Sequence, residues 1–436
     1  MASHNAHSSS AQKQTVLVLA AFAAELLLFF YSRNAFGPLL SPILYMGASV
    51  LFVGAAWRAL RGQPYLLPTS KSGYGRPQWA YVAAMAMLAV ALYPRIQEII
   101  AQYPVDVKMS DVLPSLEVYL RRLQNGEPVY ALITEFGYDL SPTYLPMMWL
   151  PYLLPDALNI DYRWLGLWVL GLGALLYAYR LAATRPSFYG GITKLLLPLL
   201  LFWPLLGHDT HILGLSIETM IVGYYFILVA GVLSQSTLLR AIGLVLCLLS
   251  RFSLLFWVPF YLWLIYRHEG PKRAIWLTAL VAVGILGIYV LPFLSADWSA
   301  FMKGQGAYTT AAVAEWQNNL NAEGNPAQLF RGVGLASLFY TYAPGDFATR
   351  INLLRLVHMV VSVGSVAAVA VWYWVSRARP TLDYRHLALL ALKLNLTFFY
   401  AFIQVPYDNL LLLVPFLSVW IIMCLKEPDP APVQSS

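Results

Sequence analysis

Charged side chains are scarce in this sequence. They make up 11% of the 436 residues, whereas apolar side chains make up 59%. A soluble domain usually carries about 25% charged residues, so this shortage excludes an ordinary water-soluble protein. The apolar residues form long continuous runs rather than alternating at every second position, which excludes a transmembrane β-barrel. Because a bilayer accepts only helices and closed barrels as spanning structures, the sequence predicts an all-α polytopic membrane protein.

Cysteines are also few. Cys247 and Cys424 both lie inside apolar runs, so we interpret them as small packing residues rather than as a disulfide or a metal-binding pair. The sequence also contains no Gly-rich phosphate loop, no Cys/His metal cluster, no nucleophile elbow and no internal repeat typical of transporters. A function therefore has to be sought in isolated polar residues.

About twelve spanning helices (10–13) are predicted, because one span needs about 20 apolar residues. Ten apolar runs qualify: 15–32, 38–57, 78–97, 162–180, 192–207, 212–233, 274–294, 351–376, 386–403 and 408–425. The stretch 240–266 is too long for one untilted span and is interrupted by Ser250, Arg251 and Pro259. It is predicted to form two short helices that meet at Arg251.

Lys and Arg in the short loops predict the orientation, because they favour the cytoplasmic side. The clusters are Arg58, Arg61, Lys71 and Arg76; Arg180, Arg185 and Lys194; Arg267, Lys272 and Arg273; and Arg377, Arg379 and Arg385. All four fall on one side if 240–266 is a hairpin and the Pro-rich segment 143–158 does not cross the membrane. The net charge of +7 is then a sign of topology rather than of a nucleic-acid partner.

This topology divides the chain into four parts and places both termini in the cytoplasm. They are a disordered tail (1–14), an N-terminal two-helix hairpin with its cytoplasmic loop (15–77), a transmembrane module (78–425) with large external loops at 98–161 and 295–350, and a C-terminal tail (426–436). Within the first external loop, residues 111–125 have apolar side chains at helical spacing. They predict a short helix lying on the membrane, with Arg121 and Arg122 on its other face.

Asp106 and Asp111 follow a predicted span on the external side. A carboxylate there is suited to act as a general base on a hydroxyl whose co-substrate is bound to lipid. The plainer alternative is that Asp106 is solvated and that Ser110 or Asp111 caps the helix that follows.

A second polar group is the short turn that contains His208, Asp209 and His211, with Glu218 two helical turns further on. These side chains are suited to bind a cation, or to hydrogen-bond a sugar or a phosphate. The alternative is an ordinary polar turn with satisfied histidines. No metal is expected as a cofactor, but the binding of a divalent ion at this turn stays an open alternative.

Arg251 is the sharpest single candidate, because a guanidinium inside an apolar stretch is usually paired or faces an aqueous cavity. At the tip of a broken hairpin it is suited to bind a lipid phosphate; a structural salt bridge or snorkelling is the alternative. Lys393 is a second cation within a span, and snorkelling toward the cytoplasm explains it equally well. Tyr407 and Asp408 are more often turn residues than ligands.

The segments 110–130 and 138–146 resemble the first extracytoplasmic loop of GT-C superfamily glycosyltransferases, in particular the family 87 (DUF2029-like) mannosyltransferases. The shared features are an acidic residue after a span (Asp111), a short helix, a Gly-x-x-x-Tyr ending (Gly126 to Tyr130) and a segment rich in Tyr and Pro. The resemblance implies a GT-C-like fold over residues 78–425 with a catalytic first external loop. It also implies that the donor is a polyprenyl-phosphate sugar rather than a nucleotide sugar. The reaction then takes place at a cell membrane, on the side away from the cytoplasm.

Carried over residue by residue, the resemblance makes Asp111 the base, with Asp106 and Asp209 as further candidates, and makes Arg251 the group that meets the donor phosphate. Candidate substrate-binding residues are His208, His211, Tyr138, Tyr144 and Tyr407. The chain departs from the family pattern in having Arg251-Phe252 where Lys-Pro is frequent, His208-Asp209 at the second polar turn, and two extra N-terminal helices.

The sequence thus predicts an inverting transferase that moves a hexose such as mannose to a glycan or lipid acceptor. Two alternatives stay open: a transporter or flippase of lipid-linked saccharides, and a non-catalytic subunit of a polysaccharide assembly complex. An enzyme transfers a labelled sugar to a new product, whereas a flippase only relocates it.

Overall fold

The computed structural model describes residues 2–63, 76–295, 297–318, 320–322, 324–376, 382–407 and 409–426. Its helices and helical turns, in chain order, are α1 (Ala2–Leu60), α2 (Arg76–Gln102), α3 (Val112–Gln124), α4 (Pro146–Trp149), η1 (Leu150–Tyr152), α5 (Leu153–Ala157), α6 (Arg163–Ala183), α7 (Phe188–Gly207), α8 (Thr210–Leu215), α9 (Glu218–Val232), α10 (Thr237–Leu248), η2 (Phe252–Leu254), α11 (Val258–Glu269), α12 (Pro271–Ile285), η3 (Leu286–Leu294), α13 (Ala300–Asn318), α14 (Ala336–Tyr342), α15 (Phe347–Val375), α16 (Tyr384–Ala401) and α17 (Leu413–Met423). The described chain is therefore helical throughout, apart from its connections.

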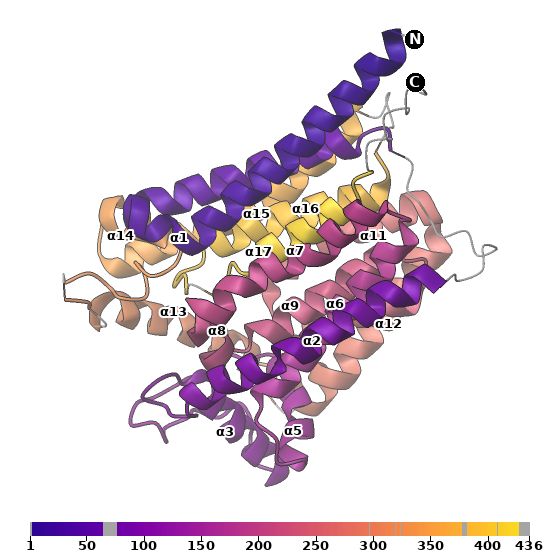
Figure 1. The fold of residues 1–436 in the computed structure, drawn as a ribbon. Coiled ribbons are helices and arrows are strands. Elements are labelled where there is room, and N and C mark those ends of the chain that lie inside the picture. The colour runs from indigo at the N-terminus through magenta and orange to yellow at the C-terminus, as the bar shows by residue number, and fades with distance from the viewer. Residues whose placement is uncertain are drawn as a thin grey trace.

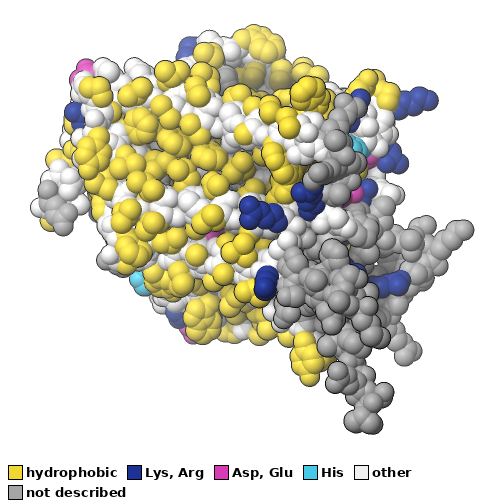
Figure 2. Space-filling model, turned by 90° about the horizontal axis from the view of Figure 1, so that it is seen from above, with side chains coloured by type: hydrophobic (Ala, Val, Ile, Leu, Met, Phe, Trp, Pro, Cys, Tyr) yellow, Lys and Arg dark blue, Asp and Glu magenta, His cyan; other side chains and the backbone are white. Residues whose placement is uncertain are grey.

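Seven helical segments in the described part of the chain are long and apolar enough to cross a membrane. They are Lys13–Arg33, Ala35–Leu60, Trp79–Gln102, Arg163–Ala183, Phe188–Gly207, Pro271–Leu294 and Phe347–Val375. Large apolar side chains on them are exposed, such as Leu51 (70%) and Trp203 (77%), and Figure 2 shows how widely hydrophobic side chains cover one face. A surface of this kind is stable in lipid rather than in water, so the prediction of a membrane-embedded helical protein is confirmed.

The predicted break at Arg251 is confirmed. Helix α10 ends at Leu248, Arg251 is extended (φ −150°, ψ 148°), and α11 begins at Val258. The Ser250 hydroxyl donates to the Cys247 carbonyl (2.9 Å) at the end of α10, and Pro259 lies in the first turn of α11, where a missing N–H costs nothing. These local features divide 240–266 into two short helices.

The prediction of one continuous span over 212–233 is wrong. The chain breaks at Ser216, which is extended (φ −130°, ψ 170°) between α8 and α9. The Ser216 hydroxyl donates to the Ile212 carbonyl (2.6 Å) and accepts the N–H of Glu218 (3.3 Å). A serine that bonds to the backbone on both sides competes with the helix ladder, and this break puts Glu218 at the start of α9.

Helix α1 differs from the prediction at its start. It begins at Ala2, in the segment for which the sequence predicts a disordered tail, and it kinks at Gly37 (φ 72°), which precedes Pro38. No glycine or proline occurs before Gly37, so nothing in residues 2–36 interrupts a helix once it has formed. The kink turns α1 into the predicted N-terminal hairpin.

The predicted short helix of the first external loop is confirmed as α3, but its surroundings are not those expected. Its apolar side chains, among them Leu113 and Leu116, are buried in the protein core rather than left for lipid. Arg122 is buried as well, and its guanidinium donates to the carbonyls of Leu132 (2.9 Å) and Ala131. The expectation that Arg122 lies on the outer face is therefore wrong, because backbone carbonyls of the loop solvate it.

The Pro-rich segment 143–158 folds into α4, η1 and α5, of four, three and five residues. These pieces are too short to span a bilayer, in agreement with the prediction for this segment. In Figure 1, α5 lies at the same end of the bundle as α3, α8, α13 and α14, and the start of α1 lies at the opposite end. The two large loops 98–161 and 295–350 therefore share one end of the molecule.

Candidate functional site

Arg251 forms an ion pair with Glu218, which was not predicted. Its Nη1 donates to Oε2 of Glu218 at 3.1 Å, and its Nη2 donates to Oε1. The Asn409 side chain donates to the same Oε1 (3.0 Å). Glu218 is buried, whereas 13% of the Arg251 side chain stays exposed. The salt-bridge alternative raised by the sequence is thus realised, and it fixes the direction of the guanidinium.

Two further elements hold Arg251 in place. The guanidinium carbon lies 5.7 Å from the ring centre of Tyr400, within the range of a cation–π contact. The hydroxyl groups of Tyr400 and Tyr225 lie 3.0 and 2.9 Å from Oγ of Ser253. Asn395 donates to the Ser253 carbonyl (2.8 Å). Helices α9 and α16 and the turn η2 are thereby joined by one polar network behind the arginine.

Asp111 precedes α3, but its carboxylate makes no capping bond to this helix. The Ser110 hydroxyl accepts the N–H of Val112 instead (3.3 Å). The Asp111 carboxylate accepts a hydrogen bond from the Tyr138 hydroxyl (3.1 Å) and is half-buried. The plainer alternative holds for an exposed Asp106 and for Ser110, which accepts the N–H at the start of the helix, whereas Asp111 is not the cap; among the described residues no hydrogen bond is made to its Oδ1.

The charges of Asp111 and Arg251 act on shared tyrosine side chains. Burial raises the pKa of Tyr144; the negative charge of Asp111 raises it further, and the positive charge of Arg251 lowers it. Burial likewise raises the pKa of Tyr407, with additional contributions from its neighbours, Asp111 among them. Since the charges of Asp111 and Arg251 both act on the same phenol, the two predicted residues lie in one region.

Tyr308 of α13 joins the same region. Burial raises the pKa of Tyr308 to about 12, while the Arg251 guanidinium acts to lower it. Burial and the carboxylate of Asp111 raise the pKa of Tyr138 to about 12. Several phenols therefore lie within electrostatic range of the carboxylate or of the guanidinium, and each of these groups can form hydrogen bonds with a hydroxyl-rich or phosphorylated ligand.

The other predicted residues lie elsewhere. Asp106 is exposed, and its Oδ1 accepts the N–H of Lys108 (2.9 Å) in a local turn. Nδ1 of His208 lies 3.0 Å from Oδ1 of Asp209, and the His208 ring lies 6.3 Å from that of Tyr31. His211 lies in the first turn of α8, and the hydroxyl of Thr210 beside it lies 2.8 Å from that of Tyr103, the residue that follows α2. Asp408 lies outside the described residues.

The predicted cation site at this turn required Glu218 as a third ligand. The Glu218 carboxylate pairs with Arg251 instead. Within the described ranges, no group of three or more His, Cys, Asp or Glu side chains is arranged to hold a metal ion.

Lys393 is not a snorkelling side chain. It is fully buried and lies 2.5 Å from Oε1 of Glu25, which is also fully buried. Ser49 and Ser418 donate to the same carboxylate at 2.5 and 2.6 Å. This pair ties α1 to α16 and α17, and it belongs to the packing of the bundle rather than to the site around Arg251.

Sequence reasoning assigned Glu218 to the turn of His208 rather than to Arg251, and it missed Asn409 and Tyr308. Glu218 carried a usable signal, since a carboxylate at an apolar run requires a partner and Arg251 interrupts another such run. Asn409 and Tyr308 carried none, because only the fold brings the α16–α17 connection and α13 to this region. In comparisons with known proteins, no family model, no curated protein and no solved structure matches this chain.

Proposed function

We propose that the chain is a membrane glycosyltransferase with a GT-C-like arrangement of about twelve helices. It moves a sugar, a hexose such as mannose, from a polyprenyl-phosphate donor to a glycan or lipid acceptor with inversion at the anomeric carbon. The observation that carries the proposal is the position of Asp111. Its carboxylate does not cap the helix that it precedes, and its charge, like that of Arg251, shifts the pKa of Tyr144. The proposed location is the cytoplasmic membrane, with the site on the extracytoplasmic face.

In this reaction the Asp111 carboxylate takes the proton of the acceptor hydroxyl. The acceptor oxygen forms a bond to the anomeric carbon, while the bond between that carbon and the phosphate oxygen breaks. The polyprenyl phosphate leaves with the electron pair, and the Arg251 guanidinium stabilises its negative charge. No metal ion or nucleotide takes part in the proposal.

The pairing of Arg251 with Glu218 is compatible with this role. A guanidinium has five N–H donors, and the two that Glu218 accepts leave others for a phosphate. The partial exposure of Arg251 (13%) contrasts with the burial of Glu218 (1%), so a ligand approaches the arginine first. In the proposal Glu218 and Tyr400 orient the guanidinium, and Tyr138, Tyr144 and Tyr407 bind the sugar.

The test is the transfer of radiolabelled hexose from a polyprenyl-phosphate donor by membranes that contain the protein. Asp111→Asn keeps the size of the side chain but removes the base, so we expect the rate to fall by about 10²–10⁴-fold. The matched control is Asp106→Asn, because Asp106 is an exposed aspartate in the same loop whose carboxylate only supports a local turn.

Transfer by Asp111→Asn at the wild-type rate, at equal protein abundance in the membrane, would contradict the proposal. The flippase alternative predicts a different outcome for the wild-type protein: the labelled lipid changes leaflet and no new product appears.

A further inference from the structure

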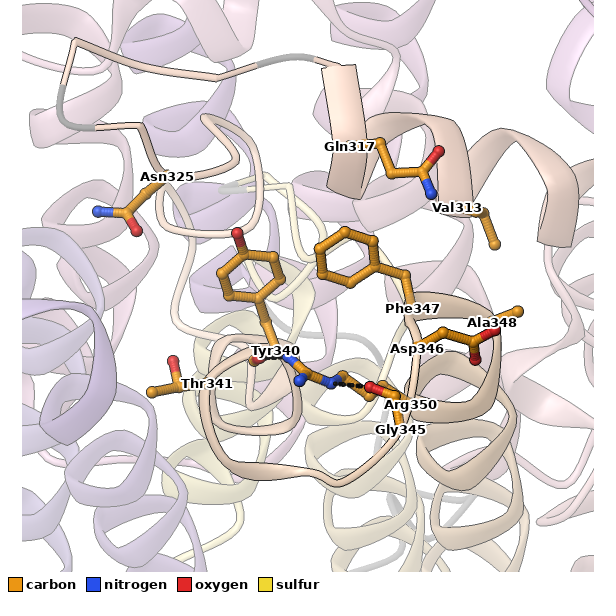
Figure 3. A pocket seen from close by; sticks show the side chains of 10 residues that line it. All are labelled: Val313, Gln317, Asn325, Tyr340, Thr341, Gly345, Asp346, Phe347, Ala348 and Arg350. Carbon is orange, nitrogen blue, oxygen red and sulfur yellow. Dashed lines mark hydrogen bonds between the residues drawn. The ribbon is translucent and has the colours of Figure 1, made fainter.

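A cavity of about 590 Å³ lies at the external-loop end of the molecule, lined by α13, α14 with the segments on either side of it, and the start of α15. Figure 3 shows the rings of Tyr340 and Phe347 in the middle of its lining, with the side chain of Asn325 on one side of them and that of Gln317 on the other. Its volume falls in the range of roughly 300–1,000 Å³ that is typical of small-molecule sites.

The aromatic part of the cavity is rigid. The rings of Tyr340 and Phe347 are stacked, with centres 5.4 Å apart and planes 7° apart. Both rings meet the edge or face of Trp316, at 5.8 and 6.4 Å. Trp316 is fully buried, and its indole N–H donates to the Gln404 carbonyl (3.0 Å). A fixed aromatic surface of this kind binds the C–H face of a ring without losing side-chain freedom.

The polar part of the cavity is open to a ligand. The side-chain amides of Gln317 and Asn325 make no hydrogen bond to any residue in the described part of the chain. Each amide offers a carbonyl acceptor and two N–H donors. Amides beside aromatic rings suit a ligand that carries many hydroxyl groups and few charges.

The charged groups of the cavity are already engaged. Oδ1 of Asp346 accepts the N–H of Thr349 (2.8 Å) and caps α15. The Arg350 guanidinium donates to the carbonyls of Gly345 (2.9 Å) and Tyr340, as the dashed lines in Figure 3 show. One acid and one base give the lining of the cavity a net charge of zero, which favours a neutral ligand over a phosphate or a cation. We propose that it binds a neutral oligosaccharide.

The position of the cavity connects it to the site of Asp111 and Arg251. Trp316 of α13, which packs against Tyr340 and Phe347, donates to the carbonyl of Gln404, three residues before Tyr407. On the same helix Gln317 follows Tyr308 by nine residues. At 1.5 Å per residue, the two positions are about 14 Å apart along the helix axis. Because the cavity adjoins the segment that leads to Tyr407, we assign an oligosaccharide held in it as the acceptor; this assignment rests on the proposed function.

The first test measures binding by the purified full chain, without any transfer reaction. Mannopentaose and maltopentaose are the probes, and titration calorimetry is the measurement. We expect at least one of them to bind. Ala348→Trp places a large ring in the cavity at an exposed position, and we expect it to weaken binding by more than about tenfold.

Gln317→Ala removes one amide, and we expect it to weaken binding about three- to tenfold. The matched control is Gln102→Ala at the exposed end of α2, which should bind as the wild type does. The proposal is overturned if the wild type binds neither probe, or if both Ala348→Trp and Gln317→Ala bind as tightly as the wild type.

The second test separates this inference from the proposed function. With a pentasaccharide acceptor, Ala348→Trp should raise KM about tenfold or more and leave kcat unchanged, whereas the rate with a methyl hexoside should not change. If the wild type transfers no sugar but binds the pentasaccharide through this cavity, the proposed function fails and the cavity stands. If transfer occurs but the cavity variants alter neither binding nor KM, the proposed function stands and the cavity fails.

Discussion

At the scale of single residues, the buried pair of Glu25 and Lys393 shows how charges are accommodated inside this bundle. Both side chains are fully buried. Both charged groups have further hydrogen-bond partners. Ser49 and Ser418 donate to the Glu25 carboxylate, and the Lys393 ammonium donates to the Val414 carbonyl (3.2 Å). The remaining side of the ammonium lies 4.8 Å from the ring centre of Phe52. Removal of one partner leaves the other charge buried alone.

We therefore expect Lys393→Met to destabilise the protein by about 3–5 kcal/mol, because an uncompensated carboxylate then stays in the apolar interior. The double variant Glu25→Leu with Lys393→Met removes both charges and should be more stable than Lys393→Met alone. Thermal unfolding in detergent, followed with a dye that reacts with the buried Cys247 thiol on unfolding, measures both.

The control for this prediction is Lys303→Met, which breaks the exposed pair with Asp297 (69% and 49% exposed) and should not change the melting temperature measurably. A double variant that is less stable than the single one would contradict the account of Lys393.

The sequence identified single residues where a charged side chain interrupts or borders an apolar run. It did not identify their partners, which are distant along the chain. Arg251 and Asp111 stand out in the sequence, and the structure brings them to one region. Lys393 also stands out, but Glu25 is 368 positions away, and a single sequence does not show which buried charges meet. Arg122 was predicted on the face opposite the apolar one. The spacing of apolar residues does not reveal that carbonyls of the following loop accept hydrogen bonds from its guanidinium and allow its burial.

At the scale of helices, the bundle depends on close approaches at glycine. All fifteen residues of α9 are buried, and α9 packs against α6. A Cβ atom added at Gly173 of α6 would lie 2.6 Å from Cβ of Phe226, whereas one added at Gly171, two residues earlier, meets nothing within 4 Å. Small residues at helix interfaces are typical of membrane proteins, because they let two backbones approach.

Two alanine substitutions on α6 test this packing. Gly173→Ala should destabilise the protein by about 1–3 kcal/mol, because the added methyl group overpacks the contact with α9. Gly171→Ala should be neutral or slightly stabilising, because alanine favours a helix over glycine by about 1 kcal/mol. The melting temperature in detergent measures both, and equal effects at the two positions would refute this picture of the interface.

The elements that sequence patterns predicted best are those with local signals. Apolar spacing predicted α3, and Ser250, Arg251 and Pro259 predicted the break between α10 and α11. The break at Ser216 was missed, because the run around it is apolar on both sides and one serine is a weak signal. That break matters for the proposed function, since it places Glu218 beside Arg251.

At the scale of the whole molecule, the two ends of the bundle differ. The start of α1 lies at one end, and α3, α8, α13 and α14 lie at the other (Figure 1). The long apolar helices between them are those expected to contact lipid. Under the proposed function, the polyprenyl chain of the donor lies among lipid tails, while its phosphate reaches Arg251 and its sugar reaches Asp111 at the end opposite the start of α1.

The most direct test of this account is photo-crosslinking of the purified protein with a polyprenyl-phosphate analogue that carries a photoreactive group next to the phosphate. We predict that mass spectrometry finds the adducts in peptides that contain Arg251 or Tyr144, and that excess polyprenyl phosphate suppresses them. Competed adducts confined to the opposite end, around Arg180 or Arg267, would contradict the account, because the donor phosphate would then lie far from Asp111.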